Sequence, residues 1–440
     1  MDAEIDERAR VLLEGVARCA WPVRRGRLSA VGEQVLEAEI PGARVGEQVL
    51  VERPGGRAVE AEVAVCRGSS ASLLPFSESS GVGPGDEVRA VAVEPRLPCG
   101  AGLLGRAIDP FGRPRDGGPS LRDVSAWPLR RPAPDPLSRP PIDTQLVSGL
   151  RALDGCLPIG IGQRVGLFAG PGLGKSTLLG TLARRAHCDV AVVCLVGERG
   201  REVREFIDGS LGARGLARSA VVVAPADAPP LVRFRALESA TAIAEWFRER
   251  GDDVLLVVDS LTRVVRARRD AALALGEPPA RGGYPASAFA ALPGLLERAG
   301  RDERGSITAV YAVLTEGGGE GADDPVAEEA RSLLDGHVVL SRKLAEAGRW
   351  PAIDLLRSVS RVAPAVAPAV QLAHAAALRR MLAALSRNED LILMGAYRRG
   401  SSPETDAALE KREAIERFLA QGSESCTVEE TRNALAALAG

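Results

Sequence analysis

Lysine and aromatic residues are scarce in this 440-residue sequence, and its cysteines follow no pattern. Aromatic residues make up 3% of the chain, and the seven cysteines include no C-x-x-C pair and no histidine at metal-ligand spacing. These absences exclude a disulfide framework and a zinc site of recognisable spacing. They predict reduced thiols in a cytosolic protein.

Positive charge is not in excess either, because the formal net charge is -2. A protein that coats nucleic acid needs surplus Lys and Arg, so nucleic acid is not an expected partner. The first residues lack the apolar core of a signal peptide, and no apolar run approaches the ~20 residues that span a bilayer. We therefore expect a soluble cytoplasmic protein that can dock on a membrane complex.

The first part of the chain, residues 1–96, combines a helical pattern with β-prone runs. Residues 2–18 alternate charged and apolar side chains at helical spacing. From Gly26 to Val93 short β-prone runs are separated by Gly, Pro and Ser clusters, which is typical of a small β-barrel or sandwich. We expect this domain to serve in oligomerisation.

The second expected domain, residues 97–368, contains a Pro- and Arg-rich connector over 113–141 and shows an α/β pattern from Gly149 onward. Helical stretches such as Leu231–Arg250 separate the apolar runs, which predicts a largely parallel sheet with helices on both faces. The runs are Arg164–Phe168, Val190–Leu195, Ala220–Ala224, Asp253–Val258, Ser306–Leu314 and Val338–Leu340. The remaining residues, 369–440, read as a helical domain, with amphipathic helices over 370–388 and 404–421.

A glycine-rich turn follows the first of these apolar runs and precedes a helix. Residues 169–176 read Ala-Gly-Pro-Gly-Leu-Gly-Lys-Ser. A strand, a glycine loop with Lys-Ser and a helix form the P-loop arrangement, in which backbone N–H groups and the helix terminus bind phosphates. The expected nucleotide-binding residues are Gly170, Pro171, Gly172, Leu173, Gly174, Lys175, Ser176 and Thr177. Lys175 would contact the β- and γ-phosphates of ATP, and Ser176 would ligate Mg²⁺. The alternative is a ligand-free αβ turn.

Two carboxylates end neighbouring apolar runs. Asp259 follows the run that starts at Asp253, where a carboxylate holds the Mg²⁺ shell in P-loop enzymes, although Asp-Ser also caps helices. Glu198 follows the run that starts at Val190. It could orient the attacking water, or it could belong to a solvated loop, and the spacing alone leaves both open.

These motifs resemble the catalytic subunits of the rotary ATP synthase superfamily. Gly197-Glu198-Arg199 is similar to that family's catalytic Gly-Glu-Arg, and residues 351–360 resemble its Pro-x-x-Asp…Ser-x-Ser signature. The resemblance implies a RecA-like core in which Glu198 and Arg199 are catalytic. It also implies that Arg361 is an arginine finger reaching a neighbour's γ-phosphate, and that Trp350 packs against adenine.

Within that superfamily the sequence resembles the ATPases of type III secretion and flagellar export over nearly all of residues 20–421. Shared stretches include 162–179 (GQRVGLFAGPGLGKSTLL), 259–263 (DSLTR), 334–342 (LDGHVVLSR) and 395–400 (GAYRRG). The tail over 418–438 resembles the injectisome branch more than the flagellar one.

The resemblance implies a homohexamer that hydrolyses ATP with Mg²⁺ and energises type III secretion. Its expected work is chaperone release and unfolding of exported proteins at the inner-membrane export gate. Its implied place is the cytoplasmic face of the bacterial inner membrane, as a peripheral protein. The implied partners are a central stalk, stator proteins and chaperone–effector complexes, with basic Arg398 and Arg399 available to an acidic stalk.

Departures and alternatives remain. The loop over 315–325 is richer in glycine than in the relatives, and no aromatic residue occurs over 420–423, so base selectivity is expected to be loose. A flagellar export ATPase is the alternative function. An RNA translocase of the termination-factor type and a non-catalytic ring subunit are further alternatives, which the paucity of aromatics over 20–95 and the presence of Glu198 and Arg361 disfavour.

Overall fold

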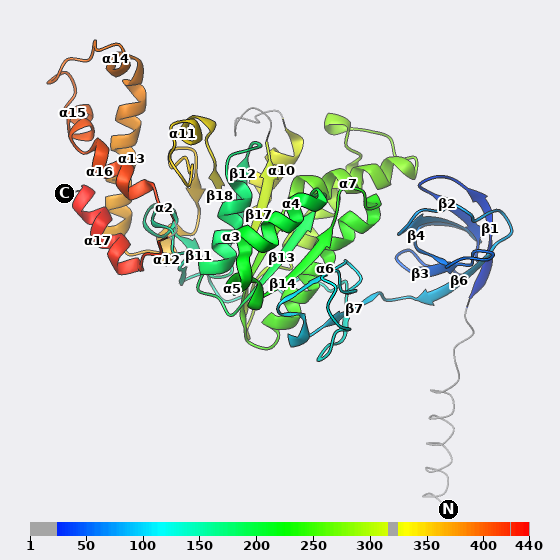
Figure 1. Ribbon diagram of the computed structural model, residues 1–440. Coiled ribbons are helices and arrows are strands. Elements are labelled where there is room, and N and C mark those ends of the chain that lie inside the picture. The colour runs from blue at the N-terminus through cyan, green and yellow to red at the C-terminus, as the bar shows by residue number, and fades with distance from the viewer. Residues whose placement is uncertain (1–23, 316–323, 423, 440) are drawn as a thin grey trace, which may run out of the picture. The chain divides into compact units, whose positions relative to one another are not determined.

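The computed structural model describes residues 24–315, 324–422 and 424–439, and the chain divides into two compact units, Met1–Pro95 and Arg96–Gly440. Figure 1 shows a barrel and a larger α/β unit that carries the remaining helices. The expected helical segment 2–18 lies outside the described residues, as does most of the glycine-rich loop. The three-domain division therefore stays a prediction.

The first unit is a closed antiparallel barrel with the strand order β1-β2-β5-β4-β3-β6. Its core consists of inward-facing apolar residues from all six strands, among them the fully buried Leu36, Val51 and Leu73. The barrel confirms the β-prone pattern. The strands are β1 (Arg25–Val31), β2 (Leu36–Glu39), β3 (Gln48–Val51), β4 (Val59–Arg67), β5 (Ser70–Pro75) and β6 (Glu87–Ala92).

The second unit is built on a nine-stranded sheet ordered β19-β18-β12-β17-β15-β13-β14-β8, with β16 paired to β17. Pairing is parallel throughout except at β19 and β16. Its strands are β8 (Arg106–Ile108), β12 (Arg164–Ala169), β13 (Val190–Val196), β14 (Ser219–Ala224), β15 (Asp253–Asp259), β16 (Gly300–Arg301), β17 (Ser306–Leu314), β18 (Gly336–Val339) and β19 (Val359–Ser360). Two small ladders flank it, β7 (Arg96–Cys99) with β9 (Ser125–Pro128), and β10 (Gln145–Leu146) with β11 (Ile159–Gly160).

Because side chains alternate along a strand, the central strands feed two apolar layers. Val192 and Cys194 of β13 face one layer, and Val193 and Leu195 face the other. The first layer is covered by α6 (Pro230–Arg248), α7 (Leu261–Ala274), α8 (Ala286–Ala290), α9 (Leu292–Leu296) and α10 (Pro325–Leu333). The second is covered by α2 (Arg151–Cys156), α3 (Lys175–Arg185), the π-turn η2 (Phe206–Leu211) and α5 (Gly212–Ala217). The predicted mostly parallel sheet with helices on both faces is confirmed.

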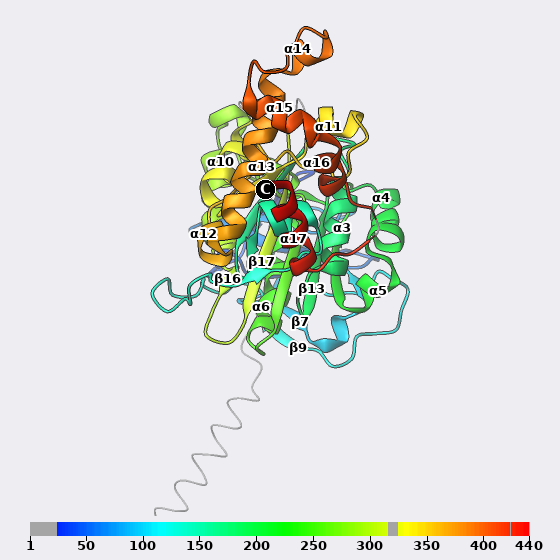
Figure 2. The same cartoon turned by 90° about the vertical axis from the view of Figure 1, so that its left-hand side faces the viewer.

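The C-terminal helices extend the second layer at one end of this unit, beside α2 (Figures 1 and 2). Buried residues of α13, α16 and α17 join the same cluster as α3, for example Leu378, Phe418 and Leu435. The remaining helices are α4 (Gly200–Glu205), α11 (Arg342–Glu346), α12 (Ala363–Val366), α13 (Ala369–Arg387), α14 (Glu389–Leu393), α15 (Pro403–Glu410), α16 (Arg412–Leu419) and α17 (Val428–Ala439).

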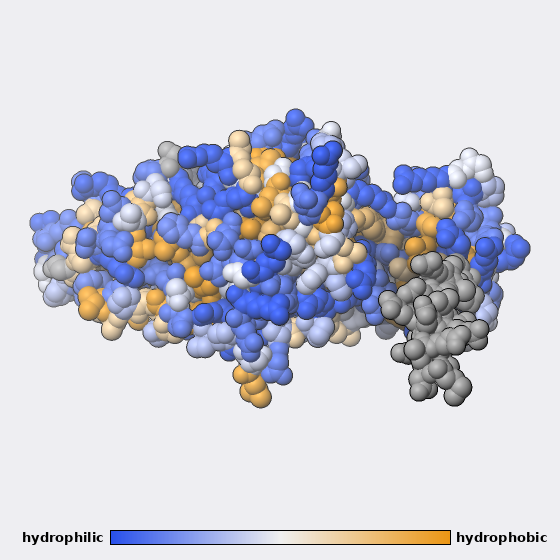
Figure 3. Space-filling model, turned by 90° about the horizontal axis from the view of Figure 1, so that it is seen from below, coloured by the Kyte–Doolittle hydropathy of each residue, from blue (hydrophilic) through white to orange (hydrophobic). Residues whose placement is uncertain are grey.

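The predicted helix over 404–421 is two helices, because the chain turns at Lys411 between α15 and α16. None of the helices in the described ranges combines the length and the apolar character needed to cross a bilayer. The face in Figure 3 is largely hydrophilic, with apolar residues in separate patches.

Candidate functional site

The P-loop lies where the sequence predicts it, between β12 and α3. Gly172 and Gly174 have φ values of 77° and 75°, a left-handed conformation that L side chains rarely adopt. At Gly172 an added Cβ would meet nothing within 4 Å, so the backbone there is open to a ligand. Gly174 is the N-cap of α3, and the first-turn N–H groups of this helix have no intrahelical acceptors. The turn is therefore shaped to bind an anion.

Three predicted side chains converge at this turn. β12, β13 and β15 are parallel, so their carboxyl ends meet at one edge of the sheet and bring Lys175, Glu198 and Asp259 together. The Lys175 ammonium forms a close ion pair with Asp259, and its Nζ lies 3.7 Å from Glu198 Oε1. Both carboxylates are buried, with 7% of Glu198 and 1% of Asp259 exposed.

Arg263 is a further cation at the site. It lies on the first turn of α7, and its Nη1 is 2.5 Å from Glu198 Oε1. Burial by itself would raise the pKa of Glu198. A hydrogen bond from Glu202 and the charges of Arg263 and Lys175 nevertheless bring that pKa below its ordinary value. The same shared hydrogen bond raises the pKa of Glu202. Glu198 is therefore held as an anion that can accept a proton or orient water.

A cavity of about 240 Å³ opens beside these groups. Its lining includes Ser176 and Asp259, a hydroxyl and a carboxylate of the oxygen type that Mg²⁺ prefers. Burial raises the pKa of Asp259 even with Lys175 beside it. A further positive charge at this carboxyl would therefore stabilise its ionised form. No group of three or more His, Cys, Asp or Glu side chains suited to a metal occurs in the described part of the chain. A bound Mg²⁺ would thus take its other ligands from phosphate and water, and the residues present fit it.

The side chain of Trp350 lies against Gly174 of the P-loop. A Cβ built on Gly174 would be 2.8 Å from the indole Cζ3 of Trp350, so only glycine allows this approach. Trp350 is 43% exposed, so it is not enclosed by the described residues. The expected place of Trp350 beside the nucleotide base stays a prediction.

Two predicted site residues lie apart from this cluster. The Arg199 side chain is 81% exposed and 3.9 Å from Glu202, and no described contact joins it to Lys175 or Asp259. Arg361 follows β19, and its backbone N–H donates to the Asp335 carbonyl just before β18. Arg361 is therefore at the amino end of β18, whereas the P-loop is at the carboxyl end of the adjacent, parallel β12.

Sequence reasoning missed Arg263, Glu202 and the remaining lining of the cavity. Arg263 occurs in the DSLTR stretch that carries the family resemblance, four residues after Asp259, and one helical turn brings it back toward the end of β15. This spacing was the available signal. Glu205, Phe206 and Ser210 of the lining gave no comparable signal, because their approach depends on how α4 and η2 fold back, and Leu195 is one apolar residue within the run of β13.

Two family models match the chain. Residues 149–360 match the ATP synthase alpha/beta family, nucleotide-binding domain, and residues 367–437 match the T3SS EscN ATPase C-terminal domain. The flagellum-specific ATP synthase of Pseudomonas aeruginosa is 48% identical over 97% of this chain and 95% of its own length. The SPI-2 type 3 secretion system ATPase of Salmonella typhimurium is 47% identical over 92% of each.

Solved structures show the same likeness. The assembled ATPase EscN of the enteropathogenic E. coli type III secretion system has a TM-score of 0.89 and 42% identity, covering 94% of this chain and all of its own. EscN in complex with its central stalk EscO gives a TM-score of 0.86 at the same identity and coverage. The barrel, the α/β core and the C-terminal helices thus recur together in a solved relative.

Proposed function

The chain belongs to the ATP synthase alpha/beta family, as an ATPase of the type III secretion and flagellar export group, and we propose that it works as a magnesium-dependent homohexamer whose sites are completed between subunits. One observation carries the proposal. Lys175, Glu198 and Asp259 meet at one end of the sheet, and Arg361 is exposed near the other end of its edge strands.

The chain's own residues divide the work. The P-loop N–H groups and Lys175 hold the β- and γ-phosphates, and Ser176 and Asp259 would hold Mg²⁺. When bound, Mg²⁺ neutralises phosphate charge. Glu198, kept anionic by Arg263 and Lys175, orients the attacking water and accepts its proton. Arg361 of the next subunit approaches the γ-phosphate and stabilises the charge of the transition state. Trp350 holds the base.

A strand-length argument supports completion by a neighbour. The six residues of β12 separate the P-loop from the level of Arg361, which at about 3.3 Å per residue is on the order of 15–20 Å. An arginine side chain cannot cover that distance to its own γ-phosphate site. In this structure Arg361 instead donates to the Arg331 carbonyl at 3.2 Å.

The proposed setting is type III protein secretion at the cytoplasmic face of a bacterial inner membrane. EscN has been solved with its central stalk EscO, and the likeness to EscN supports a comparable stalk for this chain. Stator proteins, chaperone–effector complexes, chaperone release and unfolding of cargo remain part of the proposal. Flagellar export is the second candidate, because a flagellar relative is as similar as the secretion relatives.

Mixing two inactive variants tests completion between subunits. Lys175→Ala and Arg361→Ala should each lower ATP hydrolysis, the latter by on the order of 10³-fold. In an equimolar mixed ring, about one quarter of interfaces pair an intact P-loop with an intact arginine, so phosphate release should return to roughly that share of wild type.

The control is a mixture of Glu198→Gln with Lys175→Ala. Both variants damage the same half of the site, so their mixture should stay inactive. Subunit exchange is verified by native mass spectrometry of the mixed sample. Exchange without recovery of activity would refute the shared site, and recovery in the control would refute the assignment of Glu198.

A further inference from the structure

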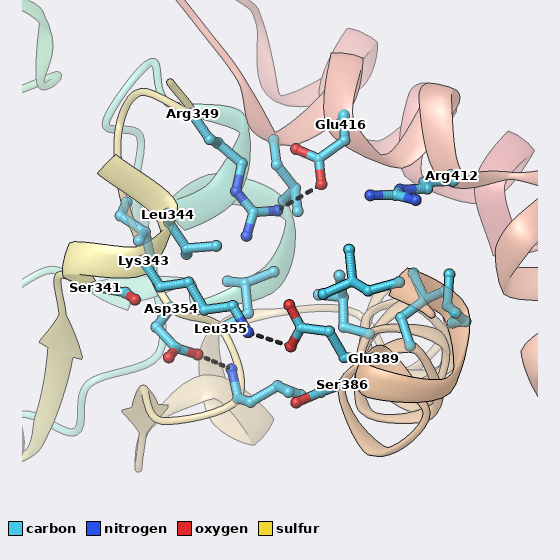
Figure 4. Close-up of a pocket in the computed structure, with 17 residues that line it drawn as sticks. Ser341, Lys343, Leu344, Arg349, Asp354, Leu355, Ser386, Glu389, Arg412 and Glu416 are labelled. Carbon is cyan, nitrogen blue, oxygen red and sulfur yellow. Dashed lines mark hydrogen bonds and ion pairs between the residues drawn. The ribbon is translucent and has the colours of Figure 1, made fainter. Parts of the chain in front are cut away.

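A cavity of about 240 Å³ separates the α/β core from the C-terminal helices, and two ion pairs cross it (Figure 4). Leu344 and Ile353 line it from the core, and Leu382, Leu385 and Ile392 line it from α13 and α14. The helices are not closely packed against the core here, so polar contacts make the bridge. These contacts are Lys343 with Glu389 of α14, and Arg349 with Glu416 of α16.

The two ion pairs differ in their surroundings. Lys343 is 67% exposed, and pairs of this kind contribute little because water screens them. The Arg349 side chain is only 10% exposed, its Nη1 lies 3.3 Å from Glu416 Oε1, and its Nε is buried without a hydrogen-bond partner in the described residues. Burial lowers the pKa of Arg349, and the charges of Glu416 and Asp354 oppose that shift. Glu416 is itself 50% exposed, but it makes the ion pair with the buried guanidinium, and its loss would leave that charge less compensated.

Arg349 also directly precedes Trp350, whose indole lies against Gly174 of the P-loop. The Trp350 carbonyl accepts a hydrogen bond of 2.8 Å from the backbone N–H of Gln421, two residues after α16 ends. The Gln421 side chain is in turn held by Arg151 N–H at 2.8 Å and by the Gly149 carbonyl. Two contacts therefore hold the backbone around Trp350. Glu416 of α16 pairs with the preceding residue, Arg349, and Gln421, just after α16, bonds the Trp350 carbonyl.

We propose that Arg349 and Glu416 are a positioning pair through which helix α16 of the C-terminal region holds Trp350 in place for the nucleotide base. The inference rests on the proposed nucleotide site and assigns a task to residues outside it. Neither residue lines the cavity beside Lys175 and Asp259, so we expect the pair to act on base binding and not on bond cleavage. Affinity for the base then depends on where α16 stands.

Competition binding distinguishes the contribution of the base to affinity from that of the phosphates. A fluorescent ADP analogue bound to the full chain is displaced by ADP or by inorganic pyrophosphate, which has no base. In Glu416→Gln the dissociation constant of ADP should rise by on the order of three- to tenfold, as expected for a weakened aromatic contact, while that of pyrophosphate stays within about twofold. In turnover, KM for ATP should rise by a similar factor with kcat nearly unchanged.

Glu389→Gln is the matched control, because it removes the other ion pair of the same cavity without any link to Trp350. It should leave both dissociation constants unchanged. Arg349→Met alone and the double variant Arg349→Met with Glu416→Gln complete the series. Because the pair acts as a unit, the double variant should bind ADP no more weakly than whichever single variant binds it less tightly.

Equal weakening of ADP and pyrophosphate would overturn the proposal, because it would mean general damage to the P-loop. An unchanged affinity for ADP in Glu416→Gln would overturn it as well. The two binding measurements, with ADP and with pyrophosphate, need neither a ring nor turnover. A wild-type chain that binds ADP through the pair but does not hydrolyse ATP would therefore contradict the proposed function and leave the positioning pair intact.

Discussion

At the scale of the single residue, Glu198 lies between two cations that come from different parts of the chain. Lys175 is supplied by the P-loop helix and Arg263 by α7. Burial opposes the ionised form of this carboxyl, but a hydrogen bond from Glu202 and the two cations bring its pKa below the usual value. The consequence is a proton acceptor that is ready at neutral pH and remains so under mild acid.

The pH dependence of turnover tests this balance. In Arg263→Gln the pKa of Glu198 should rise, because one of the charges that favour the anion is gone. Hydrolysis should then be lost at a higher pH than in wild type as the solution is acidified. The measurement is kcat against pH for both proteins, and an acidic limb that stays in place or moves to lower pH would contradict the assigned role of Arg263.

Single residues were predictable from sequence where the motif is contiguous. Lys175, Ser176 and Asp259 were found because a P-loop and an acidic strand end are local patterns, and the structure brings them together. Arg263 was missed because its contact depends on the rotation of α7 after β15. The exposed position of Arg199 could not be read from the motif either, because a neighbouring residue of a strand end can point elsewhere.

At the scale of the element, α10 shows how a short polar segment fixes a helix. Asp324 is its N-cap, and one carboxylate oxygen accepts from the N–H groups of Val326 and Ala327. Pro325 occupies the first turn, where a missing N–H costs nothing. Asp324 directly precedes Pro325 in the sequence, and the structure gives it this capping role.

Replacing the cap should loosen the helix locally. Asp324→Ala is expected to cost about 1 kcal/mol of helix stability, because two N–H groups lose their acceptor. Hydrogen exchange of the amides in α10 should accelerate, while exchange in α6 stays as in wild type. Asp324→Asn should restore protection, because asparagine caps equally well, and equal acceleration in both variants would argue against the cap.

Elements were predictable where apolar runs are long and their neighbours differ. β17 has the bounds that its run predicts, and β12, β13 and β15 differ by a residue. Edge strand β8 was missed, since three residues give too short a pattern. The tail gave no prediction of α17, whose burial against α2 and α13 comes from tertiary packing and not from local periodicity.

At the scale of the whole molecule, the barrel and the α/β unit each have a hydrophobic core of their own. The barrel strands pair all the way round, so the barrel needs no strand from the second unit. A unit with its own core can fold alone. The expected role of the barrel in oligomerisation then becomes separable from nucleotide binding.

Removing the barrel tests that separation. A chain of residues 96–440 should keep its affinity for ADP, because Lys175, Asp259 and Trp350 all lie in the second unit. Its ATP hydrolysis at a given concentration should fall, since fewer rings form. Circular dichroism, ADP binding and sedimentation velocity provide the comparison with the full chain. Full hydrolysis by a truncated chain that sediments as a monomer would contradict both the shared site and the role of the barrel.

The P-loop at the carboxyl end of β12 and Arg361 at the amino end of the neighbouring β18 give each proposed protomer a donor side and an acceptor side. In an open row of protomers joined head to tail, one P-loop at the end has no neighbouring Arg361. Only closing the row into a ring supplies an arginine to every P-loop. A lone protomer then has no complete active site, and a row has one fewer than its members. Turnover would therefore rise more steeply than protein concentration, and dilution alone would act as an off switch.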